Sequence, residues 1–241
     1  MLPRFKRRKM MVKNKIMCIF AMMKEKNNLE YGVLFDLDGV LLDTEDIYTQ
    51  FWEEIDHRYP TGIVDFARVI KGSNLHEILH KSFHDVTTRL QVTELLEEFQ
   101  RGMRYNFFDG AIEFVQTLYE QGIPAVIVTS SDDRKMNVVY AQHPHFKALF
   151  SAIITGDMVS KAKPDPECFL LGAKKIGRNI ENCFVFEDSI NGLRAAQASG
   201  ATVIGLSTTN TAEQIAPYSD VVIGGFRGFT VAQMLSTQRI D

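Results

Sequence analysis

The stretch VLFDLDG, residues 33–39, joins a short apolar run to two carboxylates that are one residue apart. An apolar run of this length is typical of a buried strand, and Gly39 allows the chain to turn sharply after it. A nucleophilic carboxylate needs to lie at such a strand end, facing an open crevice, with a second carboxyl near enough to exchange a proton with the leaving group. Asp36 and Asp38 are therefore the first candidate catalytic residues.

The same two carboxylates and glycine also occur in surface turns and in calcium loops. An EF-hand loop requires acids or amides at further alternating positions before its glycine. The chain continues after Gly39 with VLLDT, residues 40–44, and Leu41 and Leu42 argue against such a loop. A surface turn remains an alternative at this point.

The chain has 241 residues, enough for one sizeable domain or for a core with a small insert. Its 45% hydrophobic and 24% charged residues are typical of an ordinary globular protein. The three cysteines are odd in number and lack CxxC spacing, which indicates neither a disulfide framework nor a zinc knuckle. We therefore expect a reducing, cytoplasmic location.

Positive charge is concentrated near the N-terminus, where seven of the 27 basic residues precede residue 24 with no acid among them. The rest of the chain is acidic and should not bind nucleic acid by bulk electrostatics. An apolar run over residues 16–23 superficially resembles a signal peptide, but a membrane span needs about 20 apolar residues. We expect residues 1–30 to be a disordered extension or a wrongly assigned start, and we expect no membrane partner.

Short apolar runs alternate with amphipathic stretches of helical length along most of the chain. The runs predict buried strands at Tyr31–Asp36, Ala125–Thr129, Ala152–Thr155, Cys183–Phe186, Ala201–Leu206 and Asp220–Ile223. Predicted helices include Ala111–Gln121, Pro166–Ile176 and Ser189–Ser199. This alternation indicates an α/β fold with a doubly wound parallel sheet, built from residues 31–42 and 109–241.

Residues 43–108 break the alternation, because they show helical periodicity and no convincing strand. Tyr48, Phe51, Trp52 and Ile55 recur at spacings of three and four. The segment is therefore interpreted as a helical insert, with Trp52 in its core. Its position directly after the first strand places it above the carboxyl ends of the sheet, where open α/β folds bind ligands.

Three later segments also place polar residues at strand ends or helix starts. TSS, residues 129–131, follows a strand and offers hydroxyls and backbone N–H groups for phosphate oxygens. KPDP, residues 163–166, places a lysine before a helix. EDS, residues 187–189, ends another strand in acids, although Asp188 or Ser189 could simply cap a helix.

Together and in this order, the four segments resemble the signature of the haloacid dehalogenase (HAD) superfamily, in its β-phosphoglucomutase-like branch. The resemblance extends from Tyr31 to about Ile223 and includes the insert, which is similar to the family's helical cap domain. It implies a Rossmann-like core with an inserted cap. It also implies a magnesium-dependent phosphatase that acts on a small phosphorylated metabolite, with a sugar phosphate as the favoured class, through an aspartyl-phosphate.

The resemblance implies a role for each matched residue. Asp36 would be the nucleophile, and Asp38 would protonate the leaving alkoxide. Thr129 and Lys163 would hold the phosphoryl oxygens, with help from Ser130. Gly72, Ser73 and Asn74 resemble a cap loop that reaches the substrate, although Ser73 or Asn74 could equally cap a helix.

The resemblance also implies a Mg²⁺ site, since a hard cation neutralises the repulsion between an attacking anion and a phosphate dianion. Its ligands would be the carboxylates of Asp36 and Asp188 and the backbone carbonyl of Asp38, with Glu187 acting through water. Dehalogenase members lack the second aspartate. Asp38 therefore favours phosphoryl transfer.

A second motif, HEILH at residues 76–80, matches the zinc-protease pattern H-E-x-x-H. Its extended form needs glycine at position 83 and histidine at position 86, where this chain has Phe83 and Val86. We interpret His76, His80 and His84 as residues that share one face of a helix. We interpret Arg101, Arg104 and Tyr105 as a solvated helix face.

The alternative within the enzyme class is a phosphomutase, and outside it a non-catalytic binding module on the same scaffold. In the β-phosphoglucomutase pattern a histidine follows the Asp-Thr pair and an arginine follows the cap-loop glycine, whereas this chain has Tyr48 and Leu75 there. Leucine cannot pair with a second phosphate, so the hydrolase is favoured. We expect a monomer.

Overall fold

The computed structural model describes residues 30–238 of the chain. The expectations for residues 1–29 lie outside the described residues. Within the described range, no helix combines the length and the apolar character needed to cross a lipid bilayer.

Six strands form one parallel sheet in the order β3-β2-β1-β4-β5-β6. They are β1 (Gly32–Phe35), β2 (Ala125–Val128), β3 (Ala152–Ile154), β4 (Cys183–Glu187), β5 (Thr202–Leu206) and β6 (Val221–Ile223). Every predicted strand is present, and its bounds differ from the prediction by no more than one residue at either end. The predicted doubly wound α/β fold is confirmed.

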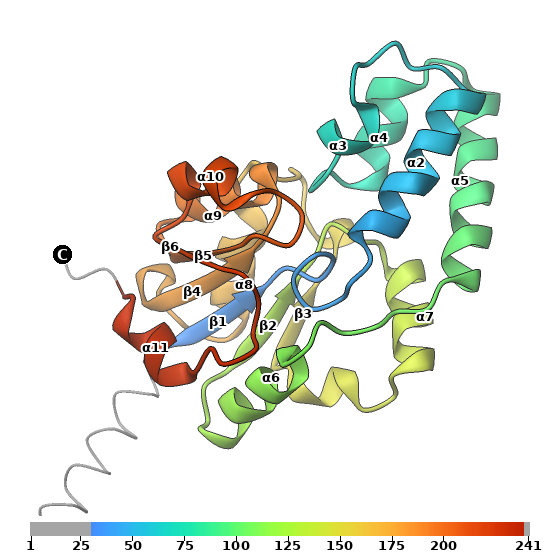
Figure 1. Ribbon diagram of the computed structural model, residues 1–241. Helices are drawn as coiled ribbons and strands as arrows, with labels where there is room; N and C mark the ends of the chain where they lie inside the picture. Colours follow the sequence, from blue (N-terminus) through green and yellow to red (C-terminus); the bar gives the residue numbers. More distant parts are fainter. Residues whose placement is uncertain (1–29, 239–241) are drawn as a thin grey trace, which may run out of the picture.

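Helices cover both faces of this sheet, as Figure 1 shows. Val33 and Phe35 of β1 belong to a buried cluster with residues of α6 (Ala111–Glu120), α7 (Asp133–Gln142) and α11 (Val231–Ser236). Leu34, between them, belongs to a second cluster with residues of α8 (Glu167–Lys175), α9 (Ile190–Ser199) and α10 (Ala212–Ile215). Burial on both faces explains why β1 is apolar throughout rather than alternating.

Short 3-10 helices occur in the connections of the core, at η1 (Phe146–Leu149), η2 (Gly156–Met158), η3 (Ile180–Asn182) and η4 (Ala216–Tyr218). The sheet changes its direction of winding between β1 and β4, because the chain adds β2 and β3 on one side of β1 and β4 to β6 on the other. Such a switch point leaves a crevice outside the carboxyl ends of the strands. Asp36 follows β1 and Asp188 follows β4, so both lie at this crevice.

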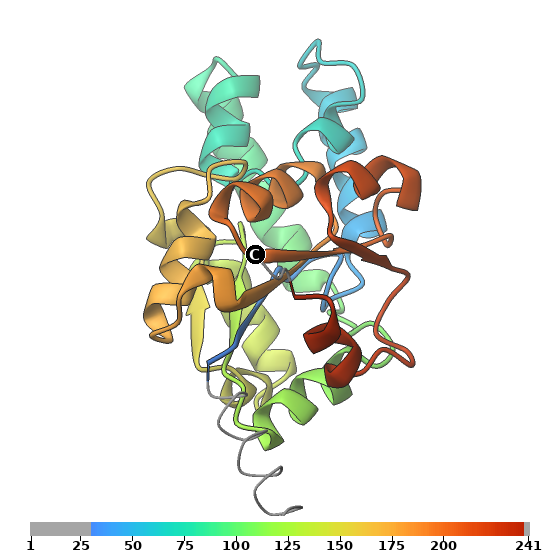
Figure 2. The same ribbon diagram turned by 90° about the vertical axis from the view of Figure 1, so that its left-hand side faces the viewer.

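The helical insert contains α2 (Glu45–Arg58), α3 (Phe66–Val69), α4 (Leu75–Ser82) and α5 (Val86–Gly102). Figures 1 and 2 show these four helices as a group at one end of the molecule. They share a buried cluster of their own that includes Trp52, Phe66 and Leu96, so the prediction of Trp52 as a core residue is confirmed. We refer to these helices as the cap. Its boundaries at residues 43 and 108 stay a prediction.

Two details differ from the sequence prediction. Tyr105 is not part of a solvated helix face, because α5 ends at Gly102 and the Tyr105 side chain is 1% exposed. Its hydroxyl donates a hydrogen bond to the Gln100 carbonyl at 3.2 Å, which satisfies the polar end of a buried ring. His84 lies beyond the end of α4 at Ser82 and so cannot share a face of that helix with His76 and His80.

Candidate active site

Three neighbouring strands bring predicted catalytic and metal-binding residues together. Asp36 follows β1, Thr129 follows β2, and Glu187 ends β4. Because β1 lies between β2 and β4, the carboxyl ends of these strands meet at one edge of the sheet. The backbone N–H of Asp36 donates to the Phe186 carbonyl at 3.0 Å and fixes the start of the Asp36 loop against β4.

Asp36 is paired with Lys163, which reaches it from the loop before α8. The Lys163 ammonium lies 2.5 Å from Asp36 Oδ1 and 3.7 Å from Glu187 Oε2. Burial alone would lower the pKa of Lys163, but the carboxylates of Asp36 and Glu187 hold that pKa above its ordinary value. Lys163 is therefore a permanent cation beside Asp36, able to hold an anionic group there.

Asp36, Glu187 and Asp188 form a buried acidic cluster. Each offers one carboxylate oxygen, and these three atoms lie within 4.8 Å of one another. Burial raises the pKa of Glu187 to about 8 and raises the pKa of Asp188 well above its ordinary value. Burial also raises the pKa of Asp36, although Lys163 opposes this shift.

Some carboxylate oxygens of this acidic cluster accept no hydrogen bond. Glu187 Oε2 and both carboxylate oxygens of Asp188 are buried without a donor in hydrogen-bonding geometry among residues 30–238, and of these only Glu187 Oε2 has an ion-pair partner, the Lys163 ammonium at 3.7 Å. A buried carboxylate without a partner costs several kcal/mol or remains protonated. A bound cation removes this cost, and hard divalent cations prefer oxygen ligands. The three residues therefore fit a metal ion.

The Asp38 carboxylate is not part of this acidic cluster and has three donors of its own. Thr44 Oγ1 donates to Asp38 Oδ1 at 2.6 Å, and Ser131 Oγ donates to Oδ2 at 3.0 Å. The Lys135 ammonium lies 2.5 Å from the same Oδ2. Burial raises the pKa of Asp38, but Lys135 and these hydrogen bonds outweigh it, so the pKa lies below its ordinary value.

Lys135 is the residue of this site that sequence reasoning missed. It lies in the first turn of α7, is 3% exposed, and its ammonium is 4.4 Å from the centre of the Tyr48 ring. A lysine at the start of an amphipathic helix normally lies in solvent. Only the fold brings it to Asp38, which is 97 residues away in the chain.

The cap loop before α4 is fastened to the core. Ser130 Oγ donates to the Gly72 carbonyl at 2.7 Å, and Asn191 Nδ2 donates to the Lys71 carbonyl at 3.0 Å. Ser130, predicted to bind substrate, thus contacts the cap loop through its hydroxyl. Gly72 has φ +81, and a side chain there would meet Ser189 Oγ at 2.8 Å, so this approach requires glycine.

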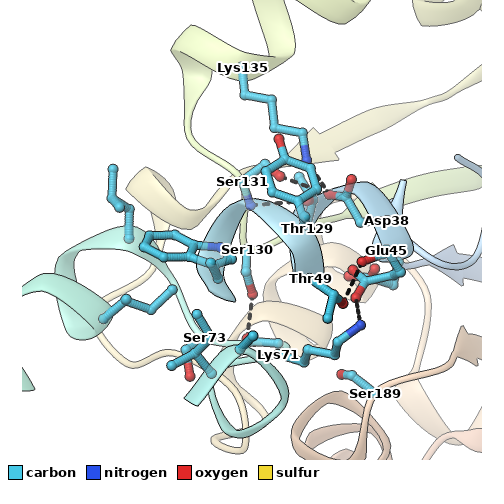
Figure 3. A pocket seen from close by; sticks show the side chains of 18 of the residues that line it. Asp38, Glu45, Thr49, Lys71, Ser73, Thr129, Ser130, Ser131, Lys135 and Ser189 are labelled. Atoms are coloured by element: carbon cyan, nitrogen blue, oxygen red, sulfur yellow. Dashed lines mark hydrogen bonds and ion pairs between the residues drawn. The ribbon is translucent and has the colours of Figure 1, made fainter. Parts of the chain in front are cut away.

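A cavity of about 120 Å³ lies between the cap and the carboxyl ends of the strands. Asp36, Asp38 and Thr129 of the core line it, and Gly72 and Ser73 of the cap loop also belong to its walls. Asn74 is not among the described residues that line the cavity. It caps α4 instead, since its side chain accepts a hydrogen bond from the Glu77 N–H at 2.8 Å. Figure 3 shows the Lys71 side chain directed at Glu45, the Lys135 side chain at Asp38, and the Ser130 side chain at the cap loop, next to Ser73.

The HEILH motif lies on α4, where the rings of His76 and His80 are 4.3 Å apart. Among residues 30–238, the group of three or more His, Cys, Asp or Glu side chains that could hold a metal ion is the cluster of Asp36, Glu187 and Asp188. It includes neither histidine.

Residues 32–200 match the family model described as haloacid dehalogenase-like hydrolase. The chain is 31% identical to hexitol phosphatase A of Escherichia coli over 185 residues, which cover 73% of this chain and 82% of that protein. It is 26% identical to the bifunctional riboflavin kinase/FMN phosphatase of Arabidopsis thaliana over 84% of this chain. That match covers 55% of the Arabidopsis protein, so this chain spans about half the length of that relative.

The structure is also similar to that of a solved protein. The match is a HAD hydrolase, family IA, variant 3, from Entamoeba histolytica, with a TM-score of 0.72 and 28% sequence identity. It covers 86% of this chain and 98% of that one.

Proposed function

Because the chain belongs to the haloacid dehalogenase-like hydrolase family, we propose that it hydrolyses phosphate monoesters of small metabolites through an aspartyl-phosphate on Asp36. The observation that supports this most is the position of the Asp36 carboxylate. It lies at the end of β1, where it pairs with the Lys163 ammonium at 2.5 Å and has an oxygen within 4.8 Å of carboxylate oxygens of Glu187 and Asp188. A carboxylate in this setting can attack phosphorus while a cation holds the phosphoryl oxygens.

In the first step Asp36 attacks phosphorus, the ester P–O bond breaks, and the leaving alkoxide takes a proton from Asp38. In the second step Asp38 takes a proton from a water molecule, which attacks the aspartyl-phosphate and releases inorganic phosphate. Thr44, Ser131 and Lys135 fix the direction in which the Asp38 carboxyl points, and because they also lower its pKa, Asp38 must take up a proton before it can act as the acid of the first step. The products are one alcohol and one phosphate per turnover.

Lys163 and Thr129 would hold the oxygens of the transferring group. Thr129 is 3% exposed and lines the cavity end nearest Asp36, while Lys163 stays charged beside the nucleophile. Fixed donors in a site that excludes water stabilise developing charge more strongly than donors in solvent do. Ser130 would act less directly, because its hydroxyl holds the Gly72 carbonyl of the cap loop.

We assign Mg²⁺ to the acidic cluster as the metal that fits best. The carboxylates of Asp36 and Asp188, together with Glu187, would hold it, and the Asp38 backbone carbonyl completes the predicted set. Bound Mg²⁺ neutralises charge on the nucleophile and the phosphate. Mg²⁺ suits the site because it takes oxygen ligands and keeps several waters in its coordination shell.

Hydrolysis is favoured over phosphoryl transfer back to the product. A mutase must hold a bisphosphate intermediate by both phosphates, whereas Leu75 at the cavity wall offers no charge to the second phosphate. The similarity to hexitol phosphatase A supports a sugar-like phosphate as one substrate class to examine first. We also propose that the protein is a monomer and that it is located in the cytoplasm.

The test is release of inorganic phosphate in the presence of Mg²⁺. The purified protein is incubated with p-nitrophenyl phosphate and then with a panel of hexitol, hexose and nucleoside monophosphates. Lys163→Met, which removes the cation beside Asp36, serves as the comparison and should lose at least about 100-fold in kcat/KM, as expected for a lost electrostatic contact in the transition state. Absence of phosphate release from every compound would refute the proposal.

A further inference from the structure

The active-site cavity continues from the acidic cluster into the hydrophobic core of the cap. Five residues line the cavity and also belong to the buried cluster of the cap, namely Trp52, Ala67, Ile70, Ile78 and Leu96. Each of these residues is less than 9% exposed. We call this apolar end of the cavity the cap chamber. Apolar chambers exclude water and favour apolar ligands.

The charges around the cavity do not favour a second anionic group on the substrate. Two lysines belong to its lining, and each is already paired with a carboxylate at 2.5 Å, Lys71 with Glu45 and Lys135 with Asp38. Both pairs are largely buried. A second phosphate or a carboxylate in the cap chamber would have to break one of these pairs or remain unpaired, and either event is costly.

A leaving group rich in hydroxyls is also poorly matched to this chamber. Each buried hydroxyl needs a hydrogen-bond partner, because burial without one costs free energy. The cap contributes hydroxyls to the lining from Tyr48, Thr49 and Ser73; Thr49 Oγ1 already donates to the Glu45 carbonyl at 2.7 Å, whereas the buried Tyr48 hydroxyl has no partner in hydrogen-bonding geometry within residues 30–238. Trp52, by contrast, offers an aromatic surface on which a planar ring can pack.

We propose that the preferred substrate is a monophosphate of an alcohol that carries an uncharged apolar ring, and that this ring occupies the cap chamber between Trp52, Ile70 and Ile78 while the phosphate lies at Asp36. This inference rests on the proposed phosphatase function and names a substrate class for the same site that differs from the sugar-like phosphate to which the similarity to hexitol phosphatase A points. Selectivity comes from burial of the ring and from the lack of an unpaired cation in the described lining.

The first experiment compares substrates that share a primary alcohol as leaving group, so that differences report binding in the chamber. The compounds are 2-phenylethyl phosphate, ethyl phosphate and glucose 6-phosphate. We expect kcat/KM for 2-phenylethyl phosphate to exceed both others at least about tenfold, which corresponds to about 1.4 kcal/mol. A kcat/KM for glucose 6-phosphate equal to or above that for 2-phenylethyl phosphate would overturn the inference.

The second experiment measures binding without turnover. Trp52 is the one tryptophan among the 241 residues of the chain, so intrinsic tryptophan fluorescence reports directly on the chamber. The protein is titrated in Mg²⁺ with 3-phenylpropylphosphonate and with propylphosphonate, whose C–P bonds resist hydrolysis. We expect a saturable fluorescence change with a Kd at least about tenfold lower for the phenyl compound. Equal Kd values would overturn the inference.

A matched pair of variants places the effect in the chamber. Ala67→Leu adds volume to its wall, whereas Ala212→Leu makes the same change at an exposed residue of α10. Ala67→Leu should lower the ratio of kcat/KM for 2-phenylethyl phosphate to that for ethyl phosphate at least about fivefold, and Ala212→Leu should leave the ratio unchanged. An unchanged ratio in folded Ala67→Leu would contradict the inference; if this variant does not fold, the fluorescence titration of the unmodified protein decides.

Selective binding of the phenyl compound, with no phosphate released from any ester, would refute the proposed hydrolysis and leave the chamber as a binding site. Phosphate release without preference for the ring would refute the chamber inference and leave the proposed hydrolysis intact.

Discussion

Removal of Lys135 is expected to destabilise the protein strongly. Its ammonium lies 2.5 Å from Asp38 Oδ2, and the two side chains are 4% and 15% exposed. Lys135→Met keeps most of the aliphatic volume but leaves the Asp38 carboxylate with hydrogen bonds from Thr44 and Ser131 alone. Loss of one partner of a buried ion pair costs about 3–5 kcal/mol, because the other charge remains buried.

The assay is urea unfolding at neutral pH of Lys135→Met, Asp38→Asn and the double variant. If the cost arises from the unpaired carboxylate, the double variant should be more stable than the sum of the single losses predicts, with a coupling of about 1–3 kcal/mol. Lys174→Met, at an exposed lysine of α8, is the control and should lie within about 0.5 kcal/mol of the unmodified protein. A loss below about 1 kcal/mol for Lys135→Met, or additive losses in the cycle, would refute the reasoning.

Three further outcomes follow from the acidic cluster and from Leu75. EDTA should abolish phosphate release and Mg²⁺ restore it, whereas Ca²⁺ should restore it poorly because its looser coordination disturbs in-line geometry; full activity in metal-free buffer would count against the metal site. In the metal-free protein, burial raises the pKa of Glu187 to about 8, so between its ordinary pKa and pH 8 the native state holds a proton that the unfolded state has lost. The free energy of unfolding in EDTA should therefore fall as pH rises from about 5 to about 8, and Glu187→Gln should flatten this slope; a slope that is the same in both proteins would be inconsistent with a buried Glu187 that titrates there. With β-glucose 1-phosphate and a trace of the 1,6-bisphosphate, free phosphate should accumulate faster than glucose 6-phosphate because Leu75 cannot hold the second phosphate; the reverse order would identify a mutase.

The sheet could be predicted from the sequence because its strands are buried on both faces. Gly32–Phe35 and Cys183–Glu187 are apolar almost throughout, and the run ends where the carboxylates begin. The same transition from apolar to acidic residues indicated the catalytic edge. The local sequence is therefore enough to predict both the positions of the strands and the acidic residues at their ends.

Contacts between distant segments could not be predicted in the same way. Ser130 and Gly72 are 58 residues apart, and the hydrogen bond between them depends on how the cap loop lies over the core. Lys135 and Tyr105 look like solvent-exposed residues in the sequence, yet both are buried. Their burial depends on how α7 and the segment after α5 pack against the rest of the protein. The helical or strand periodicity of the sequence does not show this packing.

If Asp36 is the nucleophile, its carboxylate becomes phosphorylated during turnover. The direct measurement is rapid acid quenching during hydrolysis of p-nitrophenyl phosphate in Mg²⁺, followed by proteolysis and mass spectrometry of the peptide that contains residue 36. We expect a phosphoryl group on Asp36 in the unmodified protein. Asp36→Asn should show neither the phosphoryl group nor phosphate release, although its circular dichroism spectrum stays unchanged, because an amide keeps the shape of the side chain and lacks the attacking charge. Wild-type activity in folded Asp36→Asn, or a phosphoryl group on another residue, would contradict the mechanism.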